Sequence, residues 1–570
     1  MSQSNAERAR LIIGELVRCG IDQFVIASGF RSAPLALAAA SHPSAQVTVH
    51  FDERGSAFFA LGYGRATRKP CVWITTSGTA VANGLPAVVE SAMDEVPLIC
   101  LTADRPPELR DTGANQTIDQ IHIFGSYPKW FADLPAPGAE QDTSFIRTTI
   151  DYAVHRTLGG PVHLNCMFRE PLLEKNDKDR SIPAIPWEME GVPRTLYQKE
   201  VKSVVTLDDG LLQKISNAQR GLVVSGRLRT LEEGEAISNL ANHLGWPLMA
   251  DICAPVPSIE SSVNFFDLIV RSKPFMQRHQ PDLILHFGAP LVSKELQNFL
   301  ANSSLKTYVA ISPSDSRIDP CHTVTDRVQS TIPGFCDGLL NIPSGNSSDT
   351  AWRDVWMRAD AAVWDTLSNV LQKDLSEPSL AWMLSDLLDS TNWVFGASSM
   401  PIRDLQAFFR RGKDAPRVFA NRGASGIDGS LATAAGIAEA QPGCGTVLLG
   451  DLAMLHDVNS LNLLRERDVI IVVVNNNGGG IFHMLPVALG HEEFEKVLGT
   501  PHGMDFQWAA AQFQIPYSSV DSCEEFRETW QSAVSSSGPY LIEVQTERAQ
   551  NAELHNALYR LVSEAVRSSI

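Results

Sequence analysis

The sequence lacks several features that define other classes of protein. Its nine cysteines include no Cys-x-x-Cys pair, so neither a zinc site of that type nor a disulfide framework is indicated, and a reducing cytoplasm is the expected location. The net charge is −18 and no lysine- or arginine-rich run occurs, which argues against a surface for nucleic acid or anionic lipid. The N-terminal segment lacks the apolar core of a signal peptide, and the longest aliphatic run, Val469 to Val474, is too short to cross a bilayer.

The length of the chain predicts more than one domain, because 570 residues exceed what one hydrophobic core supports. Residues 175–198 mix charge with proline and show no amphipathic period, and residues 343–350 form a short polar breaker. These joints predict three domains, at residues 1–180, 199–342 and 350–570.

In each predicted domain, short runs rich in β-branched residues alternate with longer helical patterns. This alternation is typical of βαβ units, so we expect an α/β fold of three domains, each a mainly parallel sheet flanked by helices. No sequence repeat links the three domains. The apolar runs are QFVIAS, CVWITT and LICLTA in the first domain, GLVVSG, LILHFG and TYVAIS in the second, and VFGASS, TVLLGD and VIIVVVN in the third.

Four arginines lie in or just beyond the turns that follow these runs: Arg31, Arg105, Arg403 and Arg422. Open α/β sheets bind ligands beyond the carboxyl ends of their strands. A planar guanidinium binds oxyanions in bidentate fashion, so four such residues in an acidic chain indicate a clamp for carboxylates or phosphates. Surface ion pairs of solvated loops are the alternative for any single arginine.

A candidate metal site follows two successive strands of the third domain. Asp451 comes directly after Gly450, and Asn475–Asn477 follow about two dozen residues later. A βαβ unit brings such strand ends side by side, and carboxylate and amide oxygens are ligands that Mg²⁺ accepts together with phosphate oxygens. The glycines Gly478–Gly480 allow close approach of a diphosphate. An ordinary turn is the alternative for the asparagines and glycines taken alone.

The segments GDL and NNNGG resemble the diphosphate motif of thiamine diphosphate-dependent enzymes, with Leu452 where that motif has glycine. The resemblance implies that Asp451, Asn476 and the carbonyl of Gly478 hold Mg²⁺ or Mn²⁺. It also implies a pyrimidine-binding role for the first domain and a diphosphate-binding role for the third. The cofactor-binding residues that it implies are Glu53, Ile427, Gly450, Asp451, Leu452, Asn476, Gly478, Gly479 and Ile481.

Glu53 is the residue that this resemblance matches to the glutamate that binds the aminopyrimidine ring. It follows a strand and opens an amphipathic helix, and Asp52 is placed to cap that helix. The alternative is an acidic residue that complements the helix dipole. Ile427 would support the bent conformation of the cofactor, with an ordinary core isoleucine as the alternative.

A narrower resemblance rests on HFDERG, TSGTAVAN, LTADRPPELRDTGANQTI, NRGASGIDG and VNNNGGGIF. These segments resemble the 2-succinyl-5-enolpyruvyl-6-hydroxy-3-cyclohexene-1-carboxylate synthase family of menaquinone biosynthesis; the middle domain matches weakly, mainly at GAPLVSK. The resemblance implies a transferase that decarboxylates 2-oxoglutarate and adds the succinyl unit to isochorismate in a 1,4 fashion. Both substrates carry two carboxylates, which would explain the arginines.

The same resemblance implies a set of substrate-binding residues. Asn115 and Gln116 could equally be turn residues, Lys294 a surface lysine, and the apolar members plain core. Glu53, Arg31, Arg403 and Arg422 are the implied catalytic residues. The implied substrate-binding residues are Arg31, Ser32, Arg105, Asn115, Gln116, Lys294, Ser399, Arg403, Arg422, Phe482 and Leu485.

The chain departs from this family at three places. Phe30 stands where the family has a small hydroxyl residue, the segment GASSMPIRD is one residue longer than usual, and Glu295 follows Lys294 where some members keep a second basic residue. Two other functions remain open. One is another thiamine diphosphate-dependent 2-oxoacid carboligase or lyase, and the other is a non-catalytic anion- or cofactor-binding regulatory protein.

Glu53 and Asp451 lie in the first and third domains, so one cofactor has to contact both. In this superfamily the contact runs between subunits, which implies a homodimer or homotetramer. The expected partners are small-molecule substrates, with no nucleic acid and no membrane insertion.

Overall fold

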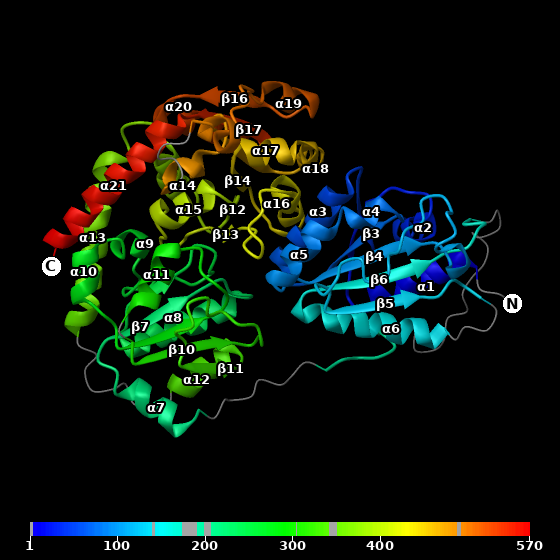
Figure 1. The fold of residues 1–570 in the computed structure, drawn as a ribbon, viewed down its shortest axis with the longest axis horizontal. Helices are drawn as coiled ribbons and strands as arrows, with labels where there is room; N and C mark the ends of the chain where they lie inside the picture. The colour runs from blue at the N-terminus through cyan, green and yellow to red at the C-terminus, as the bar shows by residue number, and fades with distance from the viewer. Residues whose placement is uncertain are drawn as a thin grey trace. The chain divides into compact units, whose positions relative to one another are not determined.

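The protein is described by a computed structural model that covers residues 4–138, 143–173, 191–198, 207–303, 305–340, 350–486 and 492–569. Most of the two predicted joints, residues 175–198 and 343–350, lies outside these ranges. The chain forms two compact units (Figure 1). The first unit contains Met1–Lys199, Asn421–Pro442 and Ala453–Asp468, and the second contains Glu200–Ala420, Gly443–Leu452 and Val469–Ile570.

The first unit contains a six-stranded sheet with the order β2-β1-β3-β4-β6-β5, in which every pairing is parallel. Strands β1, β3, β4 and β6 are buried along their whole length, as expected for a sheet covered by helices on both faces. The strands are β1 (Gln23–Ala27), β2 (Gln46–His50), β3 (Cys71–Thr75), β4 (Leu98–Asp104), β5 (Trp130–Leu134) and β6 (Pro161–Met167). The helices are α1 (Asn5–Arg18), α2 (Ala33–Ala40), α3 (Glu53–Thr67), α4 (Thr79–Ala82), α5 (Leu85–Met93) and α6 (Thr143–Arg156).

Helices α16 (Ser430–Ala440) and α18 (Leu461–Leu464), which come from later in the chain, also belong to the first unit, as does the part of α17 (Asp451–His456) from Ala453 onward. Helix α16 packs along α3 (Figure 1). The contact is close because both helices carry glycine: a Cβ at Gly62 would lie 2.0 Å from the carbonyl oxygen of Thr433, and one at Gly436 would lie 2.0 Å from that of Phe59. Side chains at these positions would separate the two helices.

The second unit contains the other two sheets. The middle sheet has the order β11-β10-β9-β7-β8 and is parallel throughout. Its strands are β7 (Gly221–Ser225), β8 (Leu248–Ala250), β9 (Leu283–Phe287), β10 (Thr307–Ser312) and β11 (Asp326–Gln329). The helices of this region are α7 (Asp209–Ser216), α8 (Leu231–Leu244), α9 (Phe266–Ile269), α10 (Lys273–Arg278), α11 (Lys294–Asn302) and α12 (Ile332–Leu340).

The third sheet has the order β13-β12-β14-β15-β17-β16 and is also parallel throughout. Its strands are β12 (Trp393–Gly396), β13 (Arg417–Phe419), β14 (Gly445–Gly450), β15 (Val469–Asn475), β16 (Tyr517–Val520) and β17 (Tyr540–Gln545). The helices are α13 (Thr350–Val370), α14 (Glu377–Leu387), α15 (Met400–Phe408), α17 (Asp451–His456), α19 (Gln507–Gln512), α20 (Cys523–Ser536) and α21 (Arg548–Ser568). The predicted class, three domains each with a parallel sheet flanked by helices, is confirmed.

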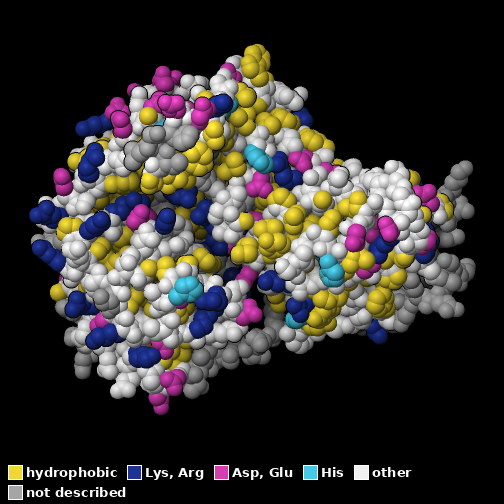
Figure 2. Space-filling view, in the orientation of Figure 1, with side chains coloured by type: hydrophobic (Ala, Val, Ile, Leu, Met, Phe, Trp, Pro, Cys, Tyr) yellow, Lys and Arg dark blue, Asp and Glu magenta, His cyan; other side chains and the backbone are white. Residues whose placement is uncertain are grey.

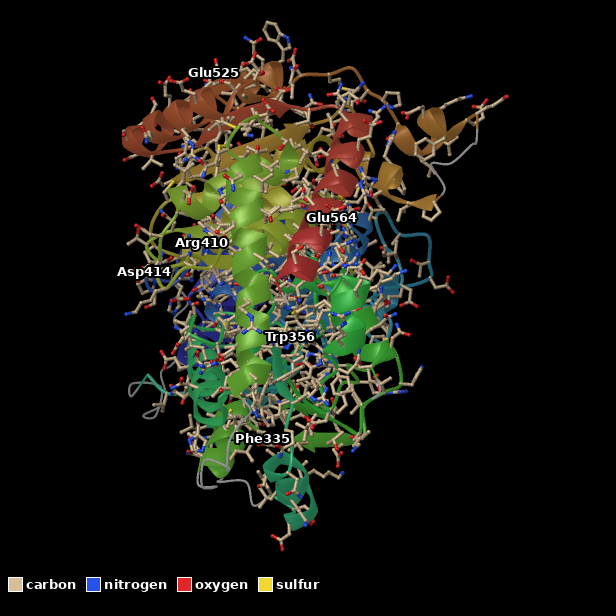
Figure 3. All side chains as sticks on the ribbon, turned by 90° about the vertical axis from the view of Figure 1, so that its left-hand side faces the viewer. Phe335, Trp356, Arg410, Asp414, Glu525 and Glu564 are labelled. Carbon is tan, nitrogen blue, oxygen red and sulfur yellow. The ribbon has the colours of Figure 1, made fainter. Side chains whose placement is uncertain are left out.

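The long helices α13 and α21 run side by side in the second unit (Figure 3). Trp356 of α13 is fully buried, and its ring lies 5.0 Å from that of Phe275, in an edge-on arrangement. The apolar core that contains Trp356 also includes residues of the middle and third sheets, so one continuous core joins these two sheets. No helix in the described ranges is both long enough and apolar enough to cross a membrane.

Candidate active site

Glu53 is the first residue of α3, as predicted. Asp52 is the N-cap and accepts a hydrogen bond from the backbone N–H of Arg54 at 2.9 Å, which confirms the predicted cap. The side-chain amide of Asn459 also donates to Asp52, at 2.6 Å. Glu53 itself is half-buried, and among the described residues its carboxylate accepts only a long contact of 3.5 Å, from the amide of Asn83. Its position is therefore fixed by the helix start while its oxygens keep acceptor capacity.

Arg31 and Arg105, each almost fully buried, lie close enough in the first unit for their charges to interact. Arg31 donates to the carbonyl of Phe168 at 3.0 Å and to the carboxylate of Glu170 at 2.8 Å. Burial, followed by the charge of Arg31, holds the pKa of Arg105 below its usual value. Two neighbouring guanidinium groups favour a ligand with negative charge.

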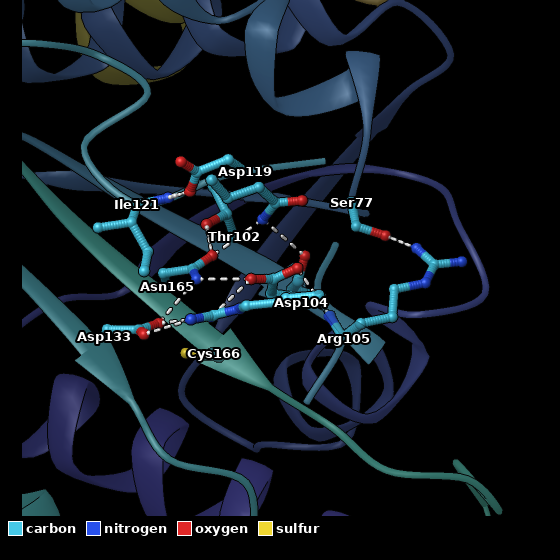
Figure 4. Close-up of polar contacts among 12 residues, drawn as sticks. Ser77, Thr102, Asp104, Arg105, Asp119, Ile121, Asp133, Asn165 and Cys166 are labelled. Atoms are coloured by element: carbon cyan, nitrogen blue, oxygen red, sulfur yellow. Dashed lines mark hydrogen bonds and ion pairs between the residues drawn. The ribbon is translucent and has the colours of Figure 1, made fainter. Parts of the chain in front are cut away.

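Arg105 is held by a buried polar network that the sequence did not reveal (Figure 4). Asp104 accepts the backbone N–H of Arg105 at 2.7 Å and the amide of Asn165 at 2.9 Å. Arg110 donates to Asp104 at 2.9 Å and forms two hydrogen bonds with Asp133. Because the buried carboxylate of Asp104 bonds both the guanidinium of Arg110 and the amide of Asn165, the network stabilises the carboxyl end of β4, which Arg105 directly follows.

Three other predicted residues lie on loops of the first unit. Gln116, with a φ of +54°, donates from its side chain to the carbonyl of Ser77 at 2.8 Å, and the Arg105 guanidinium donates to the hydroxyl of Ser77. Asn115 is exposed. Ser32 is fully buried, and its hydroxyl donates to the carbonyl of Gly29 at 3.0 Å. The structure thus links Gln116 with Arg105 through Ser77.

Arg422 and Ile427 lie on the loop between β13 and α16, and both are half-buried. The backbone carbonyl of Ile427 accepts a hydrogen bond from Ser430, the first residue of α16, at 3.0 Å. This loop belongs to the first unit, like Glu53.

Asp451 lies in the second unit and is the first residue of α17, one position past the strand end predicted for it. It is almost fully buried and accepts the backbone N–H groups of Leu452 at 2.6 Å and Gly478 at 2.8 Å. His502 lies 3.1 Å from the same carboxylate. The backbone contact with Gly478 confirms that the ends of β14 and β15 converge.

Asn476, predicted as a metal ligand, is held by Glu377 at the start of α14. Its side-chain N–H donates to Glu377 at 2.9 Å, while its amide oxygen is buried and has no hydrogen-bond partner among the described residues. Burial, followed by the charge of Asp404, raises the pKa of Glu377 to about 7. The contact fixes the amide with its oxygen free, as a cation ligand requires.

The glycines after β15 are needed for close backbone contact. A Cβ at Gly478, which has a φ of +133°, would lie 1.9 Å from the carbonyl oxygen of Gly499, and one at Gly479 would lie 2.3 Å from that of Leu498. The carbonyl of Gly478 accepts the N–H of Gly480 at 2.9 Å and retains a second lone pair. Gly450 faces open space within the described part of the chain, since a Cβ there would meet none of its atoms within 4 Å.

These residues fit a divalent cation that carries a diphosphate. They offer a buried carboxylate, a backbone carbonyl and an amide oxygen that no described residue bonds, next to Gly450, where the described atoms leave open space. No group of three His, Cys, Asp or Glu side chains suited to a metal occurs in the described part of the chain. A metal here would therefore need amide, carbonyl and phosphate oxygens to complete its shell.

The remaining predicted residues lie elsewhere in the second unit. Ser399 has a φ of +79° immediately before α15, and its carbonyl accepts a hydrogen bond from Arg403. Such a backbone conformation is costly for serine and occurs often at functional sites. Lys294 is exposed at the start of α11. Ile481 and Phe482 are half-buried and Leu485 is exposed, so none of the three is plain core.

Glu377 and His502, which contact predicted residues, were not predicted from the sequence, and neither was Asp104, which accepts the backbone N–H of Arg105. Glu377 lies about a hundred residues before Asn476, and no spacing rule joins them. Of these residues, Asp104 is the one that the sequence could have indicated, because it directly precedes Arg105 at the end of an apolar run.

Comparison with protein families defines the class. The N-terminal thiamine pyrophosphate binding domain of thiamine pyrophosphate enzymes matches residues 7–123, the middle domain matches residues 184–395, and the C-terminal thiamine pyrophosphate binding domain matches residues 402–544. The chain is thus a thiamine diphosphate-dependent enzyme, thiamine pyrophosphate being the same compound.

Individual relatives narrow the class further. A 2-succinyl-5-enolpyruvyl-6-hydroxy-3-cyclohexene-1-carboxylate synthase of Salinibacter ruber is 45% identical, over 98% of this chain and 96% of the relative. Proteins of the same name from Rubrobacter xylanophilus (44% identical, over 98% of each chain) and Chlorobium phaeobacteroides (41% identical, over 98% of this chain and 97% of the relative) also match. The chain belongs to this synthase family.

Proposed function

We propose that the protein decarboxylates 2-oxoglutarate on thiamine diphosphate and adds the succinyl unit to isochorismate, forming 2-succinyl-5-enolpyruvyl-6-hydroxy-3-cyclohexene-1-carboxylate. The observation that carries this proposal is the similarity to synthases of that name along almost the whole chain. The buried pair Arg31 and Arg105 supports it, because both substrates are dianions and the protein as a whole is acidic.

Thiamine diphosphate, when bound, supplies the electron sink for decarboxylation and carbon–carbon bond formation. Asp451, Asn476 and the carbonyl of Gly478 would hold Mg²⁺ or Mn²⁺ together with the diphosphate. Glu53 would hold the N1′ atom of the aminopyrimidine through a hydrogen bond.

The remaining predicted side chains would bind and orient the substrates. The guanidinium groups of Arg31, Arg105 and Arg422 would bind substrate carboxylates, as would Arg403. Phe482 and Leu485 would form an apolar wall that excludes water, since both carry apolar surface that the described chain does not bury.

We also propose a homodimer or homotetramer in the cytoplasm. Several large apolar side chains of the first unit are exposed, among them Phe30 at 71% and Phe51 at 63%, and apolar surface of this kind supports association. On the face shown in Figure 2, hydrophobic side chains reach the surface of both units among charged ones. All nine cysteines are free thiols, which suits a reducing compartment.

The test follows both substrates at once. The purified protein is incubated with thiamine diphosphate, Mg²⁺, 2-oxoglutarate and isochorismate, and loss of each substrate is measured, with pyruvate replacing 2-oxoglutarate in a parallel reaction. Equimolar loss of both substrates is the expected result. Preference for pyruvate would instead identify another thiamine diphosphate carboligase or lyase, and cofactor binding without turnover would identify a regulatory protein.

A further inference from the structure

A buried carboxylate holds the loop that carries Arg422. Glu90, on α5, is 2% exposed and accepts the backbone N–H groups of two consecutive residues, Gly423 at 2.8 Å and Ala424 at 2.6 Å. Arg65, on α3, donates to the same carboxylate at 3.0 Å. All of these residues belong to the first unit.

Hydrogen bonds and a counter-ion stabilise the buried carboxylate of Glu90. A carboxylate removed from water needs hydrogen bonds and a counter-ion. Both oxygens of Glu90 receive a backbone N–H, and Arg65, which also pairs with Asp94, supplies the positive charge. Charge-assisted hydrogen bonds of this kind are stronger than neutral ones, so the two amides are held firmly.

The loop is also held by close contacts at both ends. A Cβ at Gly423 would lie 2.6 Å from the backbone oxygen of Glu90, so residue 423 fits only as glycine. Gly429, at the other end, has a φ of +61°, and a Cβ there would lie 2.0 Å from the ring of Phe58. The backbone of residues 423–429 is therefore fixed against α5 and α3.

Arg422 directly precedes the two amides that Glu90 holds. It is half-buried, and within the described ranges its side chain has no hydrogen-bond or ion-pair partner. A guanidinium without an internal partner is available for an anionic ligand, and its reach depends on where the backbone places it.

We propose that Glu90 is a positioning residue, which with Arg65 as counter-ion fixes the 421–429 loop so that Arg422 binds a substrate carboxylate. The inference rests on the proposed function. Glu90 touches no substrate in this role; it acts through the backbone of Gly423 and Ala424. The alternative is a structural ion pair that stabilises the first unit without affecting Arg422.

The test compares Glu90→Gln with Arg422→Ala and with the double variant in the full-length enzyme. Glu90→Gln removes the charge and one of the two acceptor oxygens. We expect it to raise, by about tenfold or more, the KM of the same substrate whose KM rises in Arg422→Ala. On the Arg422→Ala background, the further effect of Glu90→Gln should be less than about twofold, because the two residues act as one unit.

Glu15→Gln is the matched control. Glu15 is also fully buried, accepts a backbone N–H, that of Arg194, at 2.7 Å and pairs with Arg18, but it contacts none of the predicted site residues. Its removal should leave both KM values unchanged. If Glu90→Gln yields too little folded protein, Glu90→Asp serves instead, because it keeps the charge but cannot reach both amides.

Hydrogen exchange of the 421–429 amides provides a readout independent of activity. Faster exchange in Glu90→Gln than in Glu15→Gln is expected. Unchanged KM values in Glu90→Gln, or an equal effect with and without Arg422, would overturn the inference. A wild-type protein that consumes neither substrate would instead overturn the proposed function, and the exchange data would still show whether Glu90 holds the loop.

Discussion

The first and third sheets have the same strand order but different chemistry at their strand ends. Numbered along the chain within each sheet, both follow the order 2-1-3-4-6-5. After the third strand, the first sheet has Ser77 and the third sheet has Asp451; after the fourth, the first sheet has Arg105 and the third has Asn476. The shared strand order places the ligand-binding edge, and the side chains at that edge decide what binds.

The charges at the two edges differ in a consistent way. The first sheet places two guanidinium groups, Arg31 and Arg105, in buried positions at its strand ends. The third sheet places Asp451 and Glu377 in buried positions near its own strand ends. The first arrangement suits substrate carboxylates and the second suits a divalent cation, which are the two kinds of ligand proposed for these edges.

The largest effect is expected from a substitution of Glu53, which follows the second strand of the first sheet. Glu53→Gln should leave folding and cofactor binding intact and lower kcat by about 100- to 10,000-fold, the range for loss of a proton-transfer group. Steady-state kinetics and thermal unfolding measure the two properties. Arg422→Ala, at the corresponding strand end of the third sheet, should instead act mainly on KM. Near-wild-type turnover of Glu53→Gln would remove Glu53 from the mechanism.

The second prediction concerns the cation site of the third sheet. Asp451→Ala should weaken thiamine diphosphate binding in the presence of Mg²⁺ by more than about 100-fold, since even residues that only orient metal ligands contribute 10- to 100-fold. Calorimetric titration measures the affinity. Ser77→Ala, the corresponding change in the first sheet, should alter substrate KM rather than cofactor affinity. Equal cofactor affinities in the two variants would contradict the division of roles.

The third prediction concerns Asp457, from the segment of the third domain that belongs to the first unit. Asp457 accepts the N–H of Ala432 at 3.0 Å, and burial raises its pKa from 3.8 to about 6. Between these values the folded protein retains a proton that the unfolded chain has lost, so this group lowers stability as pH rises from about 4 to about 6.

Asp457→Asn should remove this loss, which is on the order of 1–3 kcal/mol. Denaturant unfolding at several pH values measures the effect, and a slope between pH 4 and 6 identical to that of the wild type would refute the prediction.

The smallest effect is expected at Glu170, whose carboxylate forms an ion pair of 2.8 Å with Arg31. Glu170 is 67% exposed, so the pair contributes little, on the order of 0–1 kcal/mol. Glu170→Gln should free Arg31 and lower a substrate KM by about two- to threefold. Glu108→Gln, which removes another exposed glutamate paired with arginine, is the control and should change nothing. A higher KM in Glu170→Gln would show that Glu170 helps to place Arg31.

Much of the fold could be predicted because parallel strands buried on both faces appear as continuous apolar runs. β15, with the sequence VIIVVVN, is such a strand. β6 escaped prediction because it carries the polar residues His163 and Asn165, whose hydrogen bonds to neighbours such as Thr102 and Asp104 form only in the folded protein. Edge strands such as β2 and β11 are short and partly exposed, so they lack a distinctive pattern.

The sequence predicts those candidate site residues that lie close together in the chain or are separated by a recurring spacing. Asp451 and Asn476 are joined by the length of one βαβ unit. Glu377, which orients Asn476, could not be inferred, because no local rule relates the start of α14 to the end of β15.

By itself, the sequence determined the parallel α/β class and the strand-end positions of the charged residues, including the carboxylate and amides of the candidate metal site. These follow from side-chain periodicity and from local spacing, which act over one or two secondary-structure elements. The tertiary structure decided which partners hold those residues: Glu377 on Asn476, Asp104 and Asn165 beside Arg105, and Glu90 on the Arg422 loop. Such contacts join residues remote in sequence, and buried polar groups form them because folding removes the water that would otherwise satisfy them.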